Sequence, residues 1–320
     1  MVTGKGGTGK TTVAAALALA LAEEGRRTLL VEVEGRQGIA QLFETEALPY
    51  EERKIAVAPG GGEVYALAVD AERALLDYLQ MFYKLGGAGR ALKKIGAIDF
   101  ATTIAPGVRD VLLTGKVCEA VRRRARSGGF VYDAVVMDAP PTGRIARFLA
   151  VNDEVAGLAR VGPIHNQAQA VMRVIKSPET AVHLVTLLEE MPVQETVDGV
   201  ADLRAAGLPV GCVFVNMTRP ALLDRASVRA AGESRTEIAK ALSRAGLGGA
   251  RRGGRAEQLV EPLLRQAHEH AERVALEGEL RSEIARLELP TYELELLAEG
   301  ADLPGVYQLA GELREQGVAV

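Results

Sequence analysis

Glycine, lysine and threonine residues near the start of the chain have a spacing that suits phosphate binding. Residues 4–11 read GKGGTGKT and match the pattern G-x-x-x-x-G-K-[ST]. Glycines let backbone N–H groups turn toward phosphate oxygens, Lys10 would reach the β and γ phosphates, and the Thr11 hydroxyl would ligate Mg²⁺. The helix expected from Thr11 onward would direct its positive end at the same anion. The predicted phosphate-binding residues are Gly4, Gly6, Gly7, Thr8, Gly9, Lys10, Thr11 and Thr12.

Lys5 lies in the same loop as Lys10, although one lysine is enough to hold a phosphate. Two cations this close repel each other unless anions separate them. The stretch KGGTGKTT resembles the deviant Walker A class of phosphate loop. In that class the first lysine reaches across a dimer interface and stabilises charge on the partner's transferred phosphoryl group. The alternative is a Lys5 side chain that only lies in solvent at the loop edge.

An aspartate ends an apolar stretch in the middle of the chain. Residues 130–149 read FVYDAVVMDAPPTGRIARFL, in which Asp138 is followed by a stiff, small PPTG turn. A carboxylate at such a strand end can meet the shell of a magnesium ion, so Thr11 and Asp138 are the predicted metal ligands. The alternative for Asp138 is an aspartate that only shapes the turn. The PPTG turn suits a switch that senses a γ-phosphate.

This segment resembles the second switch, D-x-x-P-T-G-x-x-x-R-F-L, of the family of arsenite-pump (ArsA) and tail-anchored-protein-targeting ATPases. Glu195-Thr196, Asn216 after Val215, and Pro290 after Leu289 also match family positions. The resemblance implies bound ATP and Mg²⁺, with Asn216 and Pro290 bordering the adenine base. The alternative for Asn216 is a helix cap. The branch that the chain most resembles implies a homodimer, or a heterodimer with a paralogous ATPase.

The first switch departs from the family pattern, which places an aspartate of D-P-A-H after the second strand. Glu34 stands there instead, and it is one methylene longer. A carboxylate within hydrogen-bond reach can still polarise water, so the predicted catalytic residues are Lys5, Lys10, Glu34 and Asp138. The alternative for Glu34 is a surface or ion-paired glutamate. Glu32, two residues earlier, is a further candidate for the Mg²⁺ shell.

Composition excludes several classes of protein. The 320 residues carry a formal net charge of −4, which argues against nucleic acid as a partner. The only cysteines, Cys118 and Cys212, are far apart, so neither a disulfide framework nor a cysteine cluster for arsenite is expected. No apolar run approaches the roughly 20 residues of a membrane helix, and no signal peptide is expected. These features predict a cytoplasmic protein.

Apolar runs alternate with helical patterns, which predicts a doubly wound, mostly parallel α/β sheet of the P-loop NTPase type. We expect one P-loop ATPase domain over residues 1–320, with a helical subdomain inserted at about 71–127 and 153–180. Residues 219–257 are expected to form short helices and a mobile loop, and 256–286 one long helix bent near Pro262. Expected strands are Thr28–Val33, Val64–Val69, Val131–Asp138, Ala181–Leu187, Val210–Asn216 and Leu287–Pro290.

Three functions remain open. The first is a dimeric ATPase whose helical lobe holds a hydrophobic or membrane-protein client, to which the apolar stripe of Met81–Phe100 could contribute. Core packing is the alternative role of that stripe. The second is a partitioning ATPase on DNA or membrane, which predicts a basic face that the tail LAGELREQGVAV lacks. The third is a non-hydrolysing regulatory subunit, motivated by Glu34.

The approach to the phosphate loop is short. Only Met1, Val2 and Thr3 precede it, whereas a strand of roughly five residues should lead into such a loop. We therefore expect the natural protein to begin upstream of Met1.

Overall fold

A parallel sheet forms the centre of the fold. The computed structural model describes residues 1–83, 106–158, 163–247 and 254–318. Within them, eight strands are ordered β3-β4-β2-β5-β1-β6-β7-β8, and each neighbouring pair is parallel except β3 with β4. The strands are β1 (Val2–Gly4), β2 (Arg27–Glu32), β3 (Arg53–Val57), β4 (Glu63–Ala68), β5 (Ala134–Asp138), β6 (Val182–Thr186), β7 (Val210–Thr218) and β8 (Thr291–Glu295).

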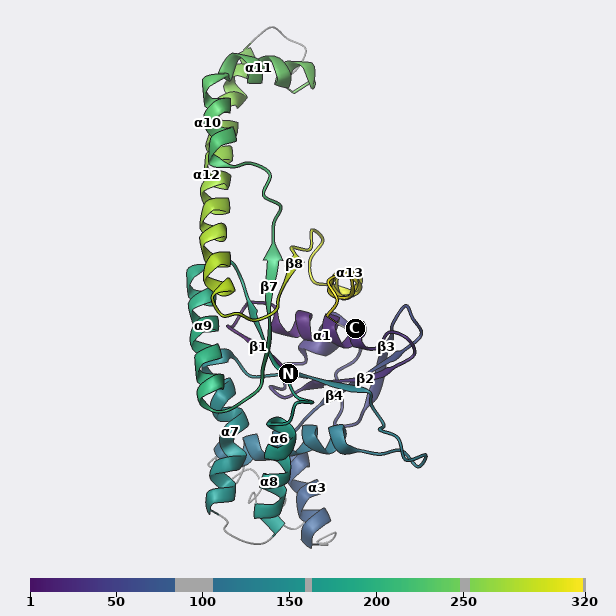
Figure 1. The fold of residues 1–320 in the computed structure, drawn as a ribbon. Helices are drawn as coiled ribbons and strands as arrows, with labels where there is room; N and C mark the ends of the chain where they lie inside the picture. The colour runs from purple at the N-terminus through teal and green to yellow at the C-terminus, as the bar shows by residue number, and fades with distance from the viewer. Residues whose placement is uncertain (84–105, 159–162, 248–253, 319–320) are drawn as a thin grey trace. The chain divides into compact units, whose positions relative to one another are not determined.

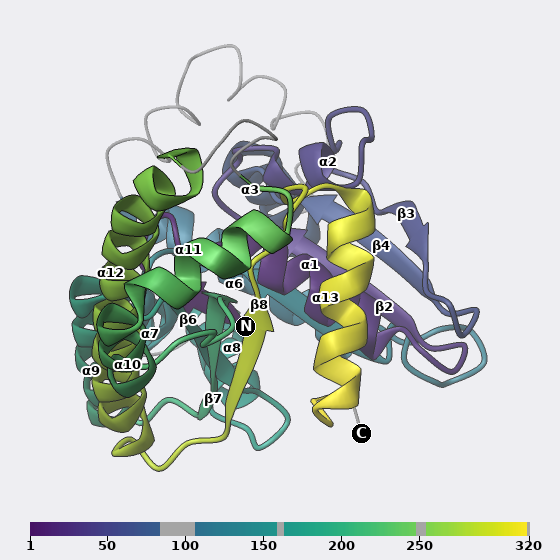
Figure 2. The same cartoon turned by 90° about the horizontal axis from the view of Figure 1, so that it is seen from above.

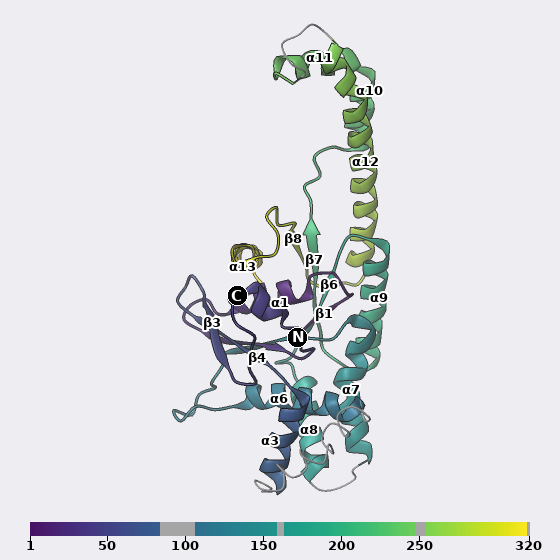
Figure 3. The ribbon, with the colours of Figure 1, turned by 180° about the vertical axis from the view of Figure 1, so that it is seen from behind.

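Helices cover both faces of this sheet, as the sequence predicts. α1 (Lys10–Leu21) and α13 (Leu303–Glu315) lie side by side on one face, and α6 (Pro106–Arg122) lies on the other (Figures 1 and 2). Figure 3 shows α3, α7 and α8 gathered beside α6. The bounds of the remaining helices around the sheet are α2 (Gly38–Leu42), α3 (Ala71–Tyr83), α7 (Thr142–Leu158), α8 (Pro163–Ile175) and α9 (Glu190–Ala205).

The apolar runs of the inner strands are buried on both faces, which explains their lack of polar alternation. Leu29 and Leu30 point to opposite faces of β2, and both are fully buried. Leu30 belongs to the core that α1 and α13 share with the sheet. α1 itself is buried all round from Val13 to Ala20, which fits a central helix beneath a second helix.

The chain divides into two compact units, each described by itself. The first holds the sheet and spans Met1–Leu187, Met191–Thr218 and Leu287–Val320. The second comprises Leu188–Glu190 and Arg219–Arg286. It contains α10 (Arg225–Glu233), α11 (Arg235–Arg244) and α12 (Gly254–Ala285), and both shorter helices pack on α12.

Most expected elements are present, with two differences. The predicted strand at Leu287–Pro290 is wrong, because β8 begins only at Thr291. Strand β3, which pairs antiparallel with β4 at the sheet edge, was not predicted. Pro262 lies inside the single helix α12. Most of the Met81–Phe100 stripe falls outside the described residues.

Candidate active site

The phosphate loop connects β1 to α1, and two of its glycines are required by close neighbours. A Cβ on Gly4 would lie 2.3 Å from the Val185 carbonyl oxygen. Gly9 has φ +83° and would place a Cβ 2.4 Å from Nδ2 of Asn216. A side chain at Gly4 would therefore collide with backbone, and one at Gly9 would be strained by its positive φ and would displace the Asn216 amide.

The start of α1 presents positive charge and unpaired amides. Gly9 precedes the helix without a side-chain cap, and the first turn contains no acidic residue. Lys10 begins the helix, and none of the described carboxylates lies within ion-pair distance of its ammonium. Backbone N–H groups in the first turn of a helix lack intrahelical partners and bind anions. This terminus therefore offers a phosphate site with a free lysine beside it.

Asp138, the last residue of β5, stands next to this terminus. Its Oδ2 accepts a hydrogen bond of 2.7 Å from Oγ1 of Thr11. Its Oδ1 is buried, and no group in the described part of the chain is hydrogen-bonded to it. Burial raises the pKa of Asp138 to about 6, although the bond from Thr11 and the charge of Lys10 act in the opposite direction. A buried carboxylate oxygen without a partner is destabilising unless a cation or donor approaches it.

These contacts fit a magnesium ion with few protein ligands. Thr11 and Asp138 already touch, and Oδ1 of Asp138 has free coordination capacity. Among the residues that the structure describes, no group of three or more His, Cys, Asp or Glu side chains could hold a metal alone. Mg²⁺ commonly uses one or two protein oxygens together with substrate phosphates and water. The donor set therefore suits Mg²⁺ that arrives with a nucleotide.

Glu32 is buried at the end of β2, in register with Asp138, and each of its oxygens accepts a hydrogen bond. Oε1 accepts a hydrogen bond of 2.5 Å from the Gln37 N–H. Oε2 accepts one of 3.3 Å from the Ile39 N–H. Both donors lie at the start of α2, so Glu32 holds the end of the loop that connects β2 to α2, which we call the first-switch loop. The role of Glu32 as a further candidate for the magnesium shell stays a prediction.

Glu34 lies in the same loop and belongs to an ion-pair chain. Its carboxylate is 3.5 Å from the Arg36 guanidinium and 3.9 Å from that of Arg144. Arg144, in the first turn of α7, also pairs with Asp110 of α6 at 3.3 Å. Sequence reasoning singled out Glu34 but missed Arg144 and Asp110. Their proximity depends on how α6 and α7 pack, and no local motif encodes it.

Lys5 pairs within its own chain. Its ammonium is 2.8 Å from Oε1 of Glu195 in α9. Oε2 of the same glutamate accepts a hydrogen bond of 3.3 Å from the Thr142 hydroxyl, at the start of α7. The phosphate loop, the second switch and α9 thus meet at one carboxylate.

The two residues predicted at the adenine base have different positions. Asn216, near the end of β7, reaches the phosphate loop, where its Nδ2 donates a 2.9 Å hydrogen bond to the Thr8 carbonyl. It therefore supports the loop, a role that sequence reasoning missed. Pro290 precedes β8, and its carbonyl accepts a bond from the Val213 N–H. Pro290 thus lies before the start of β8, whereas the phosphate loop follows the end of β1. The placement of Pro290 beside an adenine base stays a prediction.

The comparisons with known proteins bear on this site. A family model described as anion-transporting ATPase matches residues 1–179, which hold the phosphate loop and both switch segments. The chain belongs to the anion-transporting ATPase family. This confirms the resemblance to the ArsA and targeting ATPases, and it makes the chain an ATPase.

Individual relatives agree. ATPase BagA of Mycobacterium tuberculosis is 52% identical over 319 residues, covering 99% of this chain and 93% of the relative. ATPase GET3 of Eremothecium gossypii is 29% identical over 178 residues, covering 52% and 50%. The arsenical pump-driving ATPase of Escherichia coli is 25% identical over 241 residues, covering 68% and 39%. In the part of the chain that the structure describes, no helix is long and apolar enough to cross a membrane.

Proposed function

We propose that this ATPase binds Mg²⁺-ATP at the phosphate loop, hydrolyses it as a two-chain assembly, and transmits the change to the helices beside the sheet. The observation that carries the proposal is the buried, unpartnered Oδ1 of Asp138, next to Thr11 and the start of α1. A cation is the partner that this oxygen lacks. The donor-rich helix terminus provides for the phosphates that would accompany it.

We propose separate roles for the residues that bind phosphate, metal and water. The loop amides and Lys10 bind the phosphate tail, and Thr11 and Asp138 would hold Mg²⁺. When bound, the ion neutralises charge on the phosphate oxygens. Glu34, which is 20% exposed, is the carboxylate that orients and polarises the attacking water. Its pairing with Arg144 positions it without burying it.

The proposed role of Lys5 requires it to exchange partners. In one chain it pairs with Glu195, and the two side chains are 29% and 36% exposed. Ion pairs with this much exposure contribute only about 0 to 1 kcal/mol. The multiply charged phosphates of a nucleotide on a second chain are therefore able to displace Glu195. We propose that Lys5 leaves Glu195 as the two chains close.

The coupling path that we propose runs along α7. Thr142, at its start, is bonded to the carboxylate that holds Lys5. Arg144, half a turn later, links Glu34 to Asp110 of α6. Release of Lys5 and reorientation of Glu34 would both act on this helix, and through it on α6 and α8. A hydrophobic or membrane-protein client of these helices, and a cytoplasmic location, remain predictions from the sequence.

Complementation between two inactive variants tests the shared site. Lys5→Ala retains its nucleotide site but lacks the donated lysine, whereas Lys10→Ala loses the nucleotide site but still carries Lys5. We expect each variant alone to hydrolyse ATP at least about 100-fold more slowly than the native chain. Their mixture should recover activity with a rate that depends on chain concentration.

Two further measurements make this result decisive. Glu34→Gln mixed with Lys10→Ala should stay inactive, because Glu34 acts on the nucleotide of its own chain. A Lys5→Ala chain that turns over ATP at the native rate would refute the donated lysine, and a mixture without recovery would refute sharing between copies of this chain. The same design with a co-purified paralogue distinguishes a heterodimer.

A further inference from the structure

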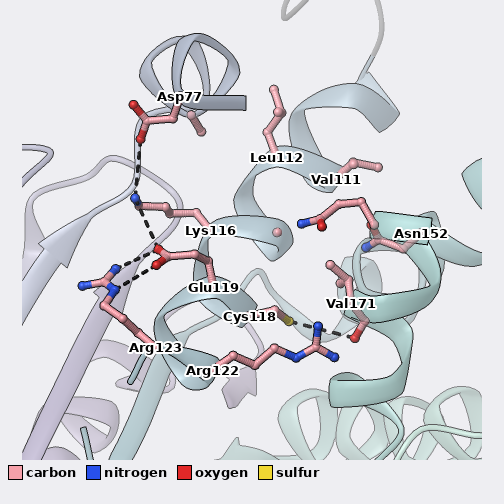
Figure 4. A pocket seen from close by; sticks show the side chains of 13 residues that line it. Asp77, Val111, Leu112, Lys116, Cys118, Glu119, Arg122, Arg123, Asn152 and Val171 are labelled. Carbon is pink, nitrogen blue, oxygen red and sulfur yellow. Dashed lines mark hydrogen bonds and ion pairs between the residues drawn. The ribbon is translucent and has the colours of Figure 1, made fainter. Parts of the chain in front are cut away.

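A cavity of about 660 Å³ lies among α3, α6, α7 and α8, away from the phosphate loop. Its volume is within the range of roughly 300–1,000 Å³ that is common for small-molecule sites. Figure 4 shows its polar side chains. Asp77, Lys116, Glu119 and Arg123 form one group, and their charges pair with one another. Arg122 and Asn152 stand apart from this group and from each other.

Asn152, on α7, has a side-chain oxygen that could accept a hydrogen bond. Its side chain is fully buried, and its Nδ2 donates a 2.8 Å hydrogen bond to Oγ1 of Thr114. The Thr114 hydroxyl donates in turn to the Asp110 carbonyl, which fixes the orientation of the Asn152 amide. Among the residues that the structure describes, none donates a hydrogen bond to the buried Oδ1 of Asn152. A buried carbonyl oxygen of this kind is destabilising unless a ligand or water donates to it.

Arg122, at the end of α6, supplies a charge without a counter-charge. Its guanidinium donates to the Ala170 carbonyl on α8, and no carboxylate among the described residues pairs with it. The Arg122 side chain is exposed, so its charge lies at the rim of the cavity, whereas the Asn152 side chain is buried in the cavity wall. Val111, Leu112 and Val171 add apolar lining.

We propose that this cavity binds an elongated carboxylic acid with an apolar middle and a hydrogen-bond donor at its far end. The carboxylate pairs with Arg122, and a hydroxyl or N–H at the other end donates to Oδ1 of Asn152. Arg122 follows Thr114, the partner of Asn152, by eight residues on α6, which is about 12 Å along the axis at ~1.5 Å per residue. An arginine side chain on a helix leans back toward the helix start, which shortens this separation, so we choose a chain of medium length as the ligand.

Binding of ω-hydroxyoctanoate to the full chain, measured by calorimetry without nucleotide, tests the proposal. Octanoate lacks the donor and α,ω-octanediol lacks the charge. We expect each to bind the native chain about tenfold more weakly than ω-hydroxyoctanoate, because each loses one hydrogen-bonded contact. Arg122→Gln should weaken the hydroxy acid to a similar extent, whereas Arg124→Gln, outside the cavity, should leave binding unchanged.

Asn152→Leu gives the sharper comparison. It should remove the preference for ω-hydroxyoctanoate over octanoate while leaving octanoate binding within about twofold. If that variant does not fold, the difference in ω-hydroxyoctanoate binding between Arg122→Gln and Arg124→Gln still tests the proposal. Failure of all three probes to bind the native chain, or equal binding by native, Arg122→Gln and Arg124→Gln chains, would overturn the proposal and leave the cavity to water. Lys10→Ala should retain the binding, which separates this result from failure of the nucleotide site.

Discussion

Two buried carboxylates at the ends of adjacent strands have opposite surroundings. Glu32 ends β2 and Asp138 ends β5, and the two residues are direct partners across the parallel pair. Both oxygens of Glu32 accept backbone N–H groups of the first-switch loop. Asp138 receives one bond from Thr11, and its second oxygen has no partner. Similar chemistry at equivalent positions therefore has different consequences.

The difference lies in how completely each group is satisfied. A carboxylate whose two oxygens both accept hydrogen bonds within the chain contributes to the stability of that chain. One with a buried, unpartnered oxygen destabilises the free protein and gains most from a ligand. We therefore propose a structural role for Glu32 and a ligand-binding role for Asp138.

The largest effect is expected when Asp138 is changed. Asp138→Asn keeps the shape and an acceptor for Thr11 but removes the charge that would face the metal. Turnover of ATP should fall about 100-fold or more, on the order of losses seen when an electrostatic group of an active site is removed. The melting temperature without nucleotide should not fall, because a buried charge is lost. Steady-state hydrolysis together with calorimetry checks both statements. Turnover close to native would contradict the ligand-binding role of Asp138 and its contrast with Glu32.

Changing Glu32 should produce the reverse pattern. Glu32→Gln places an amide group against one of two backbone N–H donors, which removes a charged hydrogen bond. We expect the free energy of unfolding to fall by about 2 kcal/mol. Turnover under stabilising conditions should stay within a few-fold of native. Urea unfolding provides the measurement, and unchanged stability with lost hydrolysis would mean that Glu32, not Asp138, serves the ligand.

A third buried titratable group, His183 in β6, should have a smaller effect, on the pH dependence of stability. Nδ1 of His183 accepts a 3.2 Å bond from the Cys212 N–H, which requires a neutral ring at that nitrogen. Burial lowers the pKa of His183 to about 3. The unfolded chain then binds a proton below pH ~6.5 that the folded chain does not, so stability is lost as pH falls through that range.

The pH dependence of unfolding tests this statement. The loss attributable to His183 should reach about 1 to 2 kcal/mol near pH ~5, at ~1.4 kcal/mol for each unit below the ordinary value. His183→Gln keeps an acceptor but does not titrate, so its unfolding free energy should decline less steeply between neutral pH and pH ~5. Identical slopes for the two chains would contradict the neutral assignment.

Sequence reasoning succeeded where the determinants are local. The phosphate loop, its helix and the strand that ends at Asp138 are contiguous patterns whose geometry follows from neighbouring residues. It missed Arg144 with Asp110, and the hold of Asn216 on the Thr8 carbonyl, because these contacts join distant segments. The strand predicted at Leu287–Pro290 is displaced, because β8 begins only at Thr291 and pairs with Val213 from there on. A local apolar pattern does not fix where a parallel strand starts to pair with its neighbour.

The measurement closest to the central claim is the effect of Mg²⁺ on nucleotide affinity. Fluorescent ATP is titrated into the native chain, Asp138→Asn and Glu32→Gln, each with Mg²⁺ and with a chelator. We predict that Mg²⁺ strengthens binding to the native chain and to Glu32→Gln by the same factor, and that this gain is lost in Asp138→Asn. An equal gain in all three chains would contradict the assignment of the unpartnered Asp138 oxygen to the metal.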